Sequence, residues 1–222
     1  MIAVPPVPPP HYPTPAARMA DFVLHMVGLV AALFGGGVLL GLALGLGKFN
    51  QLIAIGVYTG GLLLMLAFST AYNFANGRRK PLLRRFDHAG IFLMIAGSYT
   101  PFTTHSLTGA WAWGMTSAVW AVAGLGVLGK LFLPGLGRRF WVGVYLALGW
   151  LALVAIKPLI EGLSWAALML LALGGVLYTS GVIFYVNKRL KFSRAIWRGH
   201  IVAAAGAHWA AILVGVLLAS AR

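Results

Sequence analysis

Arg84-Arg85-Phe86-Asp87-His88-Ala89-Gly90-Ile91 is the most informative segment of this chain. Two basic residues lead through an acidic residue into a long apolar run without charges. Only 3 of the 222 residues are acidic, and an acidic side chain at the mouth of a membrane span is costly to keep there. Because such residues usually have a function, the stretch predicts both a membrane helix and a site at its entrance.

The composition of the whole chain predicts a polytopic membrane protein. Hydrophobic residues make up 60% of the chain and charged residues 9%, which is more apolar surface than a soluble domain of this length needs. The net charge of +14 lies in short loops between apolar runs, a pattern that indicates membrane orientation rather than nucleic-acid binding. The chain has no cysteines, so disulfides and thiol chemistry are excluded.

Seven segments are long and apolar enough to cross a bilayer, which takes about 20 residues. They are continuously apolar rather than alternating, which favours helices over a β-barrel. We therefore predict an all-α fold, a bundle of seven transmembrane helices. The predicted spans are Phe22–Leu46, Leu52–Asn73, His88–Thr104, Trp111–Leu133, Trp141–Ile156, Trp165–Val186 and Ala195–Leu218.

Basic residues are distributed unevenly over the segments that flank these spans. Thirteen of the 17 Lys and Arg residues lie before span one or in the loops after spans two, four and six, whereas three lie on the other side. Because cytoplasmic loops carry an excess of Lys and Arg, the N-terminus is predicted in the cytoplasm and the C-terminus outside.

The first 17 residues differ in composition from the rest of the chain. They contain seven prolines, which favour an extended chain and cannot pack into a core. We predict that residues 1–17 form a disordered, proline-rich cytoplasmic tail and that residues 18–222 form the seven-helix membrane domain.

Gly37, Gly41 and Gly45 form a stripe of small residues along the first span. Such a stripe lets another helix approach closely. The helix that it meets is predicted to belong to the same chain, and a helix-mediated homo-oligomer is the alternative.

Polar side chains on four spans are predicted to lie at a similar depth near the cytoplasmic side. Residues four apart share one face of a helix, and polar groups inside a membrane usually turn inward and find partners. The candidate binding residues are Asp21, Asn73, Asp87, Arg194 and Arg198, and His25, Ser69 and His88 belong to the same polar group.

Each of these residues also has a purely structural interpretation. The two aspartates could cap helix N-termini, where a carboxylate meets the positive end of the helix dipole. The two arginines could extend to lipid headgroups. Ser69 could bond to a carbonyl of its own helix, and Asn73 could simply end its span.

Three segments of the chain look familiar. Residues 86–102 read Phe-Asp-His-Ala-Gly-Ile-Phe-Leu-Met-Ile-Ala-Gly-Ser-Tyr-Thr-Pro-Phe, residues 69–73 read Ser-Thr-Ala-Tyr-Asn, and residues 195–197 read Ala-Ile-Trp with His208 further on. Together they resemble the hemolysin III-like proteins, the bacterial branch of the progestin and adipoQ receptor family, which includes the adiponectin receptors. The resemblance implies seven spans, a cytoplasmic N-terminus and a place in the bacterial plasma (inner) membrane.

The resemblance also implies a zinc site. The family belongs with the alkaline ceramidases in a group of zinc-dependent membrane hydrolases, in which three histidines on spans two and seven hold the metal. A serine and an aspartate orient or activate the zinc-bound water, whose pKa the metal lowers. Ser69 and Asp87 occupy the serine and aspartate positions and are the candidate catalytic residues.

The three histidine positions are occupied by Asn73, Arg194 and Arg198 in this chain. A guanidinium cannot ligate a metal because it stays protonated, so no metal and no cofactor are predicted at these positions. The two arginines carry the same double positive charge as a zinc ion. We expect Asp21 and Asp87 to pair with them in a low-dielectric cluster.

Several classes of function follow. We favour a metal-free lipid-binding or regulatory relative of the membrane hydrolases, with membrane lipids as partners, and the replaced ligands argue against an enzyme. The alternative is a zinc-dependent lipid amide or ester hydrolase with a shifted ligand set drawn from His25, His88 and His200 with Asp21 or Asp87. Membrane permeabilisation ranks lower, because the apolar runs are typical of constitutive helices. A transporter would need charges or broken helices near mid-membrane.

Overall fold

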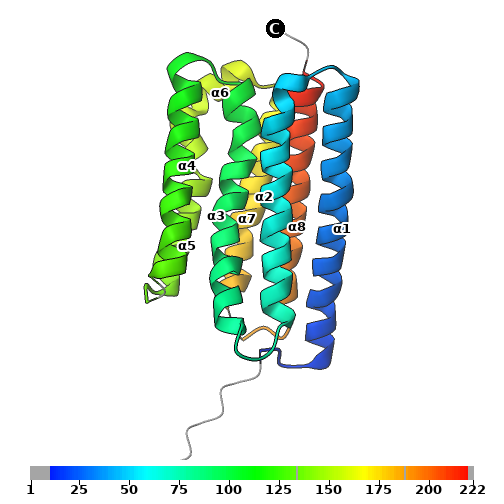
Figure 1. Ribbon diagram of the computed structural model, residues 1–222, viewed down its shortest axis with the longest axis vertical. Helices are drawn as coiled ribbons and strands as arrows, with labels where there is room; N and C mark the ends of the chain where they lie inside the picture. Colours follow the sequence, from blue (N-terminus) through cyan, green and yellow to red (C-terminus); the bar gives the residue numbers. More distant parts are fainter. Residues whose placement is uncertain (1–10, 134, 188, 220–222) are drawn as a thin grey trace, which may run out of the picture.

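The chain folds into helices that stand side by side, as the computed structural model in Figure 1 shows. The structure describes residues 11–133, 135–187 and 189–219, and contains no strand within them. The helices are α1 (Pro15–Gly45), α2 (Phe49–Phe74), α3 (Lys80–His105), α4 (Gly109–Phe132), α5 (Arg138–Gly149), the 3₁₀ helix η1 (Leu151–Ala155), α6 (Ile156–Gly162), α7 (Trp165–Val186), α8 (Ser193–Ile212) and the π-helical turn η2 (Leu213–Leu217).

Seven helical spans result, since α5, η1 and α6 follow one another as a single crossing. Within the described residues, six segments can cross a membrane by length and composition: α1, α2, α4, α5 to α6, α7 and α8 with η2. The remaining helix, α3, carries Lys80, Arg84, Arg85 and Asp87 near its start, yet it runs alongside α2 and α4 (Figure 1). The predicted all-α bundle is confirmed, and the chain is an integral membrane protein.

The bundle is closed by α8, which packs against both α1 and α7, while α2 packs against α1 and α3. Residues 11–14, the α2–α3 loop and the α7–α8 loop lie at the same end of the bundle, the lower end in Figure 1. We call this end the basic end, because Lys and Arg are concentrated there. The positive-inside rule predicts that it faces the cytoplasm.

Helices α1 and α3 begin well before the predicted spans, at Pro15 and Lys80. Helix α1 starts at Pro15, where Thr14 is the N-cap and its side chain accepts a 3.2 Å hydrogen bond from the Ala17 amide. Helix α3 starts at Lys80 with a proline in its first turn, a position that tolerates the missing amide hydrogen. Of the predicted tail, residues 1–10 lie outside the described residues, residues 15–17 belong to α1, and residues 11–14 contact the bundle as described below.

The fifth span is longer than predicted and is broken in its middle. It runs from Arg138 to Gly162, with the 3₁₀ helix η1 between α5 and α6. The Tyr99 hydroxyl on α3 fills the break: it lies 3.1 and 2.9 Å from the carbonyl oxygens of Leu148 and Gly149 and accepts a 2.8 Å bond from the Ala152 amide. Backbone groups released inside a membrane need such partners.

Glycines mark where helices touch and where they do not. A methyl group added at Gly97 of α3 would lie 3.0 Å from the Val57 carbonyl oxygen of α2, so only glycine permits this approach. In contrast, methyl groups added at Gly37, Gly41 and Gly45 would meet no described atom within 4 Å. The expectation that this stripe packs within the chain is therefore wrong, because it lies on the exposed side of α1. The homo-oligomer stays a prediction.

Candidate functional site

A polar cavity of about 240 Å³ lies at the basic end, between α1, α2, α3, α5, α7 and α8. The five candidate binding residues inferred from the sequence and the candidate catalytic residue Ser69 line it. Arginines outnumber aspartates by two among its charged lining residues, so the cavity has an excess of positive charge. These charged residues are Asp21, Arg84, Asp87, Arg138, Arg194 and Arg198.

Arg198 is the most deeply buried of the arginines in the cavity. Its side chain is 6% exposed, and its Nη2 donates a 2.6 Å hydrogen bond to Ser69 Oγ. Its Nε has no hydrogen-bond partner among the described residues. Arg198 therefore does not extend to lipid headgroups at the surface, and one of its donors remains to be satisfied inside the site.

Ser69 receives hydrogen bonds from two directions. Its hydroxyl oxygen accepts from Arg198 and, at 3.4 Å, from Asn73 Nδ2, which also donates a 2.9 Å bond to the Ser69 carbonyl. The predicted bond from Ser69 to a carbonyl of its own helix is not among these contacts. Since Arg198 and Asn73 both donate to the hydroxyl oxygen of Ser69, the hydroxyl hydrogen can itself be donated to another acceptor. A hydroxyl that accepts from a charged donor becomes a stronger donor itself.

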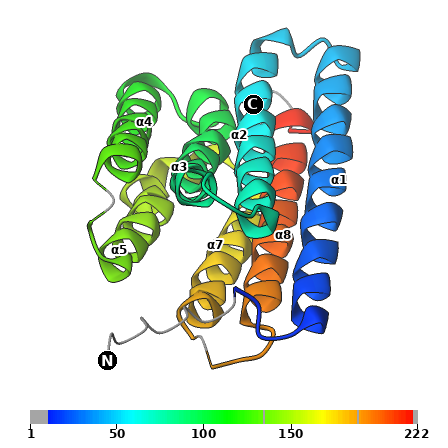
Figure 2. The same cartoon turned by 60° about the horizontal axis from the view of Figure 1, so that its bottom comes forward.

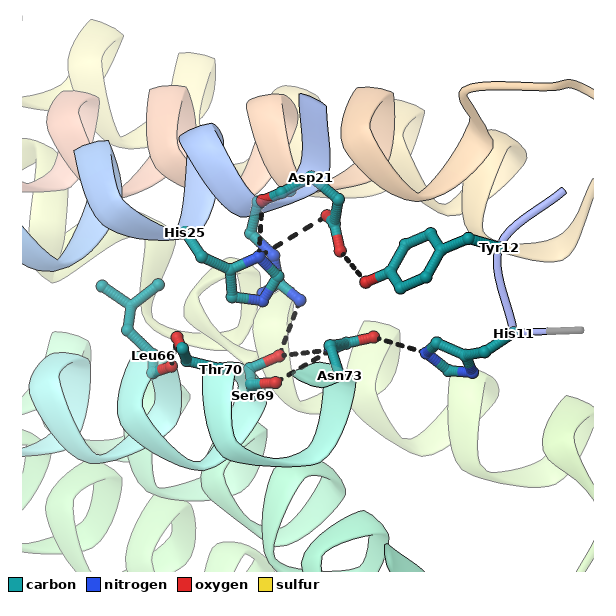
Figure 3. Close-up of polar contacts among 9 residues, drawn as sticks. His11, Tyr12, Asp21, His25, Leu66, Ser69, Thr70 and Asn73 are labelled. Carbon is teal, nitrogen blue, oxygen red and sulfur yellow. Dashed lines mark hydrogen bonds and ion pairs between the residues drawn. The ribbon is translucent and has the colours of Figure 1, made fainter. Parts of the chain in front are cut away.

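Asp21 lies on α1 opposite these groups and is 1% exposed (Figure 3). Its Oδ2 accepts a 2.6 Å hydrogen bond from the Tyr12 hydroxyl, while its Oδ1 has no hydrogen-bond partner among the described residues. One turn deeper, His25 Nδ1 donates a 2.7 Å bond to the Asp21 carbonyl oxygen and lies 3.6 Å from Asp21 Oδ1. The opposite nitrogen, His25 Nε2, is buried without a partner in the described structure.

Residues 11–14, which we call the strap, lie at the basic end before α1 begins (Figure 2), and His11 and Tyr12 contact residues that line the cavity (Figure 3). The Tyr12 ring stacks on Phe74 with centroids 6.2 Å apart, and the Arg194 guanidinium carbon lies 5.6 Å from its centroid. His11 Nε2 donates a 3.0 Å hydrogen bond to Asn73 Oδ1, since the Asn73 amide nitrogen is already used by Ser69.

The strap residues are held in their uncharged forms. Burial and the neighbouring Asp21 carboxylate raise the pKa of the Tyr12 phenol, so Tyr12 keeps the proton that it donates. Burial lowers the pKa of His11, and the positive charges of Arg194 and Lys80 act in the same direction, against its hydrogen bond to Asn73 and the charge of Asp21.

Sequence reasoning missed both His11 and Tyr12. They were assigned to a disordered tail because prolines surround them. The signal that could have identified them is the change in composition within that tail, where a histidine and an aromatic residue stand directly before the helix. An aromatic side chain can then bury its ring while its polar tip finds a partner.

The expected pairing of two arginines with two aspartates is not present. Within the described residues, neither Arg194 nor Arg198 has a carboxylate oxygen within 4.0 Å; the ion pairs found are His25 with Asp21 and His88 with Asp87. Arg198 bonds to Ser69, and Arg194 lies against the Tyr12 ring. The physical reason is that each charged group is hydrogen-bonded to a hydroxyl rather than to an opposite charge. Arg198 donates to the Ser69 hydroxyl, and Asp21 accepts from the Tyr12 hydroxyl.

The interpretation of the aspartates as helix caps is also wrong. The N-caps are Thr14 for α1 and Arg79 for α3, and both aspartates lie further inside their helices. Asp87 Oδ2 is 3.9 Å from His88 Nδ1, which itself donates a 2.6 Å bond to the Arg84 carbonyl. The Asp87 side chain is 17% exposed and lines the cavity.

Comparison with known proteins agrees with this architecture. A sequence model of the haemolysin-III-related proteins matches residues 18–209 of the chain, which includes every helix that lines the cavity. The chain belongs to the haemolysin-III-related family. This confirms the resemblance drawn from residues 69–73, 86–102 and 195–197.

Relatives of the family align over most of their own length. The chain is 31% identical to a hemolysin-3 homolog of Bacillus subtilis (strain 168) over 88% of this chain and 92% of the relative. It is 32% identical to hemolysin-3 of Bacillus cereus over 90% and 92%. It is also similar to a human monocyte to macrophage differentiation factor, at 24% identity over 90% of this chain and 84% of that protein.

The side chains of this haemolysin-III-related protein do not fit the zinc ion that the resemblance implies. The three expected ligand positions hold an amide and two guanidiniums, and one guanidinium is bonded to Ser69. The part of the chain that the structure describes contains no group of three or more His, Cys, Asp or Glu side chains arranged to hold a metal. His200 does not join His25 and His88, because it packs against Phe184 and donates to the Ile196 carbonyl.

An apolar groove of about 220 Å³ accompanies the polar cavity in this haemolysin-III-related fold. It lies between α1, α2 and α8, and Ile201 lines both spaces. Its rims at Ala31 and Gly206 are exposed, so it opens toward the membrane between α1 and α8. The groove residues are Gly28, Ala31, Ala32, Gly35, Leu62, Leu66, Ile201, Val202, Ala205, Gly206 and Trp209.

Proposed function

We propose that this chain is a metal-free member of the haemolysin-III-related family that binds an anionic lipid headgroup at the basic end, in the plasma (inner) membrane of a bacterium. The observation that carries the proposal is Arg198. Its guanidinium is buried, faces the cavity, and has one nitrogen without a partner among the described residues. A buried charged donor of this kind is costly unless it meets an acceptor.

Charge and hydrogen-bonding capacity favour a phosphate monoester as the headgroup. The cavity has two more arginines than aspartates among its lining residues, and a phosphate monoester carries a charge of about −1.5 to −2 near neutral pH. Arginine binds phosphate oxygens in a planar, two-bond geometry. The Ser69 hydroxyl, which is polarised by Arg198, would supply a further donor.

The groove favours a lipid over a free phosphate ion. On α8, Arg198 lies about one turn before Ile201. Because an α-helix rises about 1.5 Å per residue, Arg198 lies about 16 Å before Trp209 along the helix axis. An amphiphile whose phosphate meets Arg198 could thus extend a chain along the groove, which is lined by apolar and small residues. Its volume exceeds the roughly 150 Å³ of an apolar cavity that takes up benzene.

Ligand-induced stabilisation tests the proposal directly. The purified protein in neutral phosphatidylcholine nanodiscs is heated with increasing dihexanoyl phosphatidic acid, with dihexanoyl phosphatidylcholine and inorganic phosphate as separate arms. Because a ligand that binds only the folded state stabilises it by about 2.7 kcal/mol at 100 times its Kd, phosphatidic acid should raise the melting temperature. Arg198→Gln should abolish the shift, while Arg85→Gln, whose side chain bonds to the exposed Leu131 carbonyl outside the cavity, should keep it.

Two results would contradict this function. An equal shift with inorganic phosphate would assign the site to a free anion rather than a lipid. An unchanged shift in Arg198→Gln would show that the ligand binds elsewhere.

The metal-free part of the proposal has its own test. Zinc is measured in the purified protein and in the triple variant Asn73→His, Arg194→His, Arg198→His. About one equivalent of zinc in the triple variant and none in the parent supports a converted family site. Stoichiometric zinc in the parent would restore the lipid amide or ester hydrolase with another ligand set.

A further inference from the structure

The strap contacts polar residues of the cavity in which Arg198 and Ser69 would meet a headgroup. Tyr12 covers Asp21 through its hydroxyl and Arg194 through its ring, and His11 takes the Asn73 amide oxygen. All three of these contacted residues line the cavity. We propose that the strap is an intramolecular pseudo-ligand, which closes the site at rest and must leave before an anionic lipid headgroup can bind.

The strap binds as a ligand would, through side chains rather than through a continuous packed element. Its backbone is not helical, and Pro13 in its middle is exposed. Its first two residues reach three different helices: Tyr12 touches α1 and α8, and His11 touches α2. Few contacts hold it, so it can detach without unfolding a helix.

Thr14 marks the position from which the strap would rotate away from the cavity. This residue is extended, with φ −147° and ψ 155°, and its side chain caps α1 by accepting from the Ala17 amide. The cap fixes the start of α1 independently of Tyr12 and His11. Rotation of the backbone before Thr14 would therefore release both side chains and leave α1 intact.

Closure of the strap has a quantitative consequence for binding, and this step rests on the proposed function. The apparent Kd of a ligand equals its intrinsic Kd divided by the fraction of molecules in the binding-competent state. Loss of a hydrogen bond to a charged acceptor shifts such an equilibrium by about 10-fold or more. Tyr12→Phe, which keeps the ring and removes only the hydroxyl, should therefore tighten apparent lipid binding by about 10-fold.

The first experiment follows the strap without any ligand. The chain has no cysteines, so a Pro13→Cys, Asn76→Cys pair accepts two spin labels, one on the strap and one on the exposed α2–α3 loop. The pair should give a narrow distance distribution, which Tyr12→Phe or His11→Ala broadens toward longer distances. A distribution that neither substitution changes would overturn the idea that these contacts hold the strap.

The second experiment adds dihexanoyl phosphatidic acid in neutral nanodiscs. The lipid should broaden the same distance distribution, and its apparent Kd should fall at least about threefold in Tyr12→Phe. Tyr178→Phe is the matched control, because Tyr178 lines neither the cavity nor the groove, and it should leave the Kd unchanged.

Each contrary outcome has a distinct meaning. Weaker binding in Tyr12→Phe would make Tyr12 part of the ligand site and overturn the competition. Binding that leaves the strap distances unchanged would overturn it as well. If no version binds the lipid while Tyr12→Phe still releases the strap, the proposed function fails and the competition with it, whereas the closing contacts of the strap are supported.

Discussion

Arg198 on α8 donates a 2.6 Å hydrogen bond to Ser69 on α2, across 129 positions of sequence. The bond links the two helices at the level of the cavity and places a buried guanidinium beside a serine that the family resemblance associates with catalysis. Because Ser69 also accepts from Asn73, two of the three positions assigned to metal ligands converge on one hydroxyl oxygen. A hydrogen-bonded network thus stands where the family pattern has imidazoles.

Removing the acceptor of this network should destabilise the protein. Ser69→Ala leaves a donor of Arg198 without its partner, while Asn73 keeps its 2.9 Å bond to the backbone carbonyl of residue 69. A buried unsatisfied donor costs about 1–3 kcal/mol. The melting temperature in detergent should fall clearly below that of Ser180→Ala, whose hydroxyl bonds to the Leu177 carbonyl of its own helix. Equal losses in the two variants would show that the contact between Arg198 and Ser69 contributes little.

The two aspartates should differ in their effect on stability. Asp21 is 1% exposed and accepts from Tyr12, whereas Asp87 is 17% exposed and lies 3.9 Å from His88. Asp21→Asn should cost about 1–2 kcal/mol through its weakened charged hydrogen bond, and Asp87→Asn less than about 0.5 kcal/mol. Thermal unfolding of both variants in the same detergent checks this, and a larger loss in Asp87→Asn would favour the paired-charge arrangement expected from the sequence.

Closure of the strap should weaken as the pH falls. The pKa of His11 is lowered in the closed strap by burial and by Arg194 and Lys80, against Asn73 and Asp21, so closure favours the neutral ring. Its contribution is complete above the ordinary histidine pKa of about 6.5 and is lost as the pH falls through the lowered value.

Spin-label mobility at Pro13→Cys measures this dependence between pH 8 and pH 4. Mobility should rise toward acid pH in the parent and stay constant in the His11→Gln background. A pH dependence that is the same in both proteins would assign the effect to another group.

Filling the apolar groove should shorten the lipid that the site can hold. A Cβ atom at Gly206 would meet no described atom within 4 Å, so Gly206→Leu adds volume at the exposed rim of the groove. It should reduce affinity for didecanoyl phosphatidic acid several-fold and leave dihexanoyl phosphatidic acid nearly unaffected. Gly37→Leu, on the exposed face of α1 outside the groove, is the matched control and should change neither. Equal weakening of both lipids in Gly206→Leu would exclude the groove as a chain site.

The break in the fifth span should depend on a single hydroxyl. Tyr99→Phe removes the partner of backbone groups at Leu148, Gly149 and Ala152 and should cost about 1–3 kcal/mol. Tyr178→Phe removes a buried hydroxyl that has no hydrogen-bond partner among the described residues, so it should be neutral or stabilising. The two melting temperatures, measured side by side, distinguish these effects, and identical values would contradict the assignment.

The sequence by itself determined the class of fold and the family of this protein. Continuous apolar runs require helices in a bilayer, because every backbone group must find a partner within its own segment. The segments 69–73, 86–102 and 195–197 together indicated the family, and the depth of each polar residue followed from its distance along a helix. For that reason the five candidate binding residues and Ser69 were placed at one end, where they line one cavity.

Only the tertiary structure decided which of these groups touch. Helical spacing fixes the depth of a side chain but leaves its direction and its neighbours on other helices open. The sequence therefore allowed a predicted pair between Arg198 and a carboxylate, whereas the fold brings Arg198 to Ser69. The same limit applies to the strap: composition marked residues 11–14 as a tail, and the fold carries Tyr12 to Asp21 and His11 to Asn73 because the ends of α1, α2 and α8 meet beneath them.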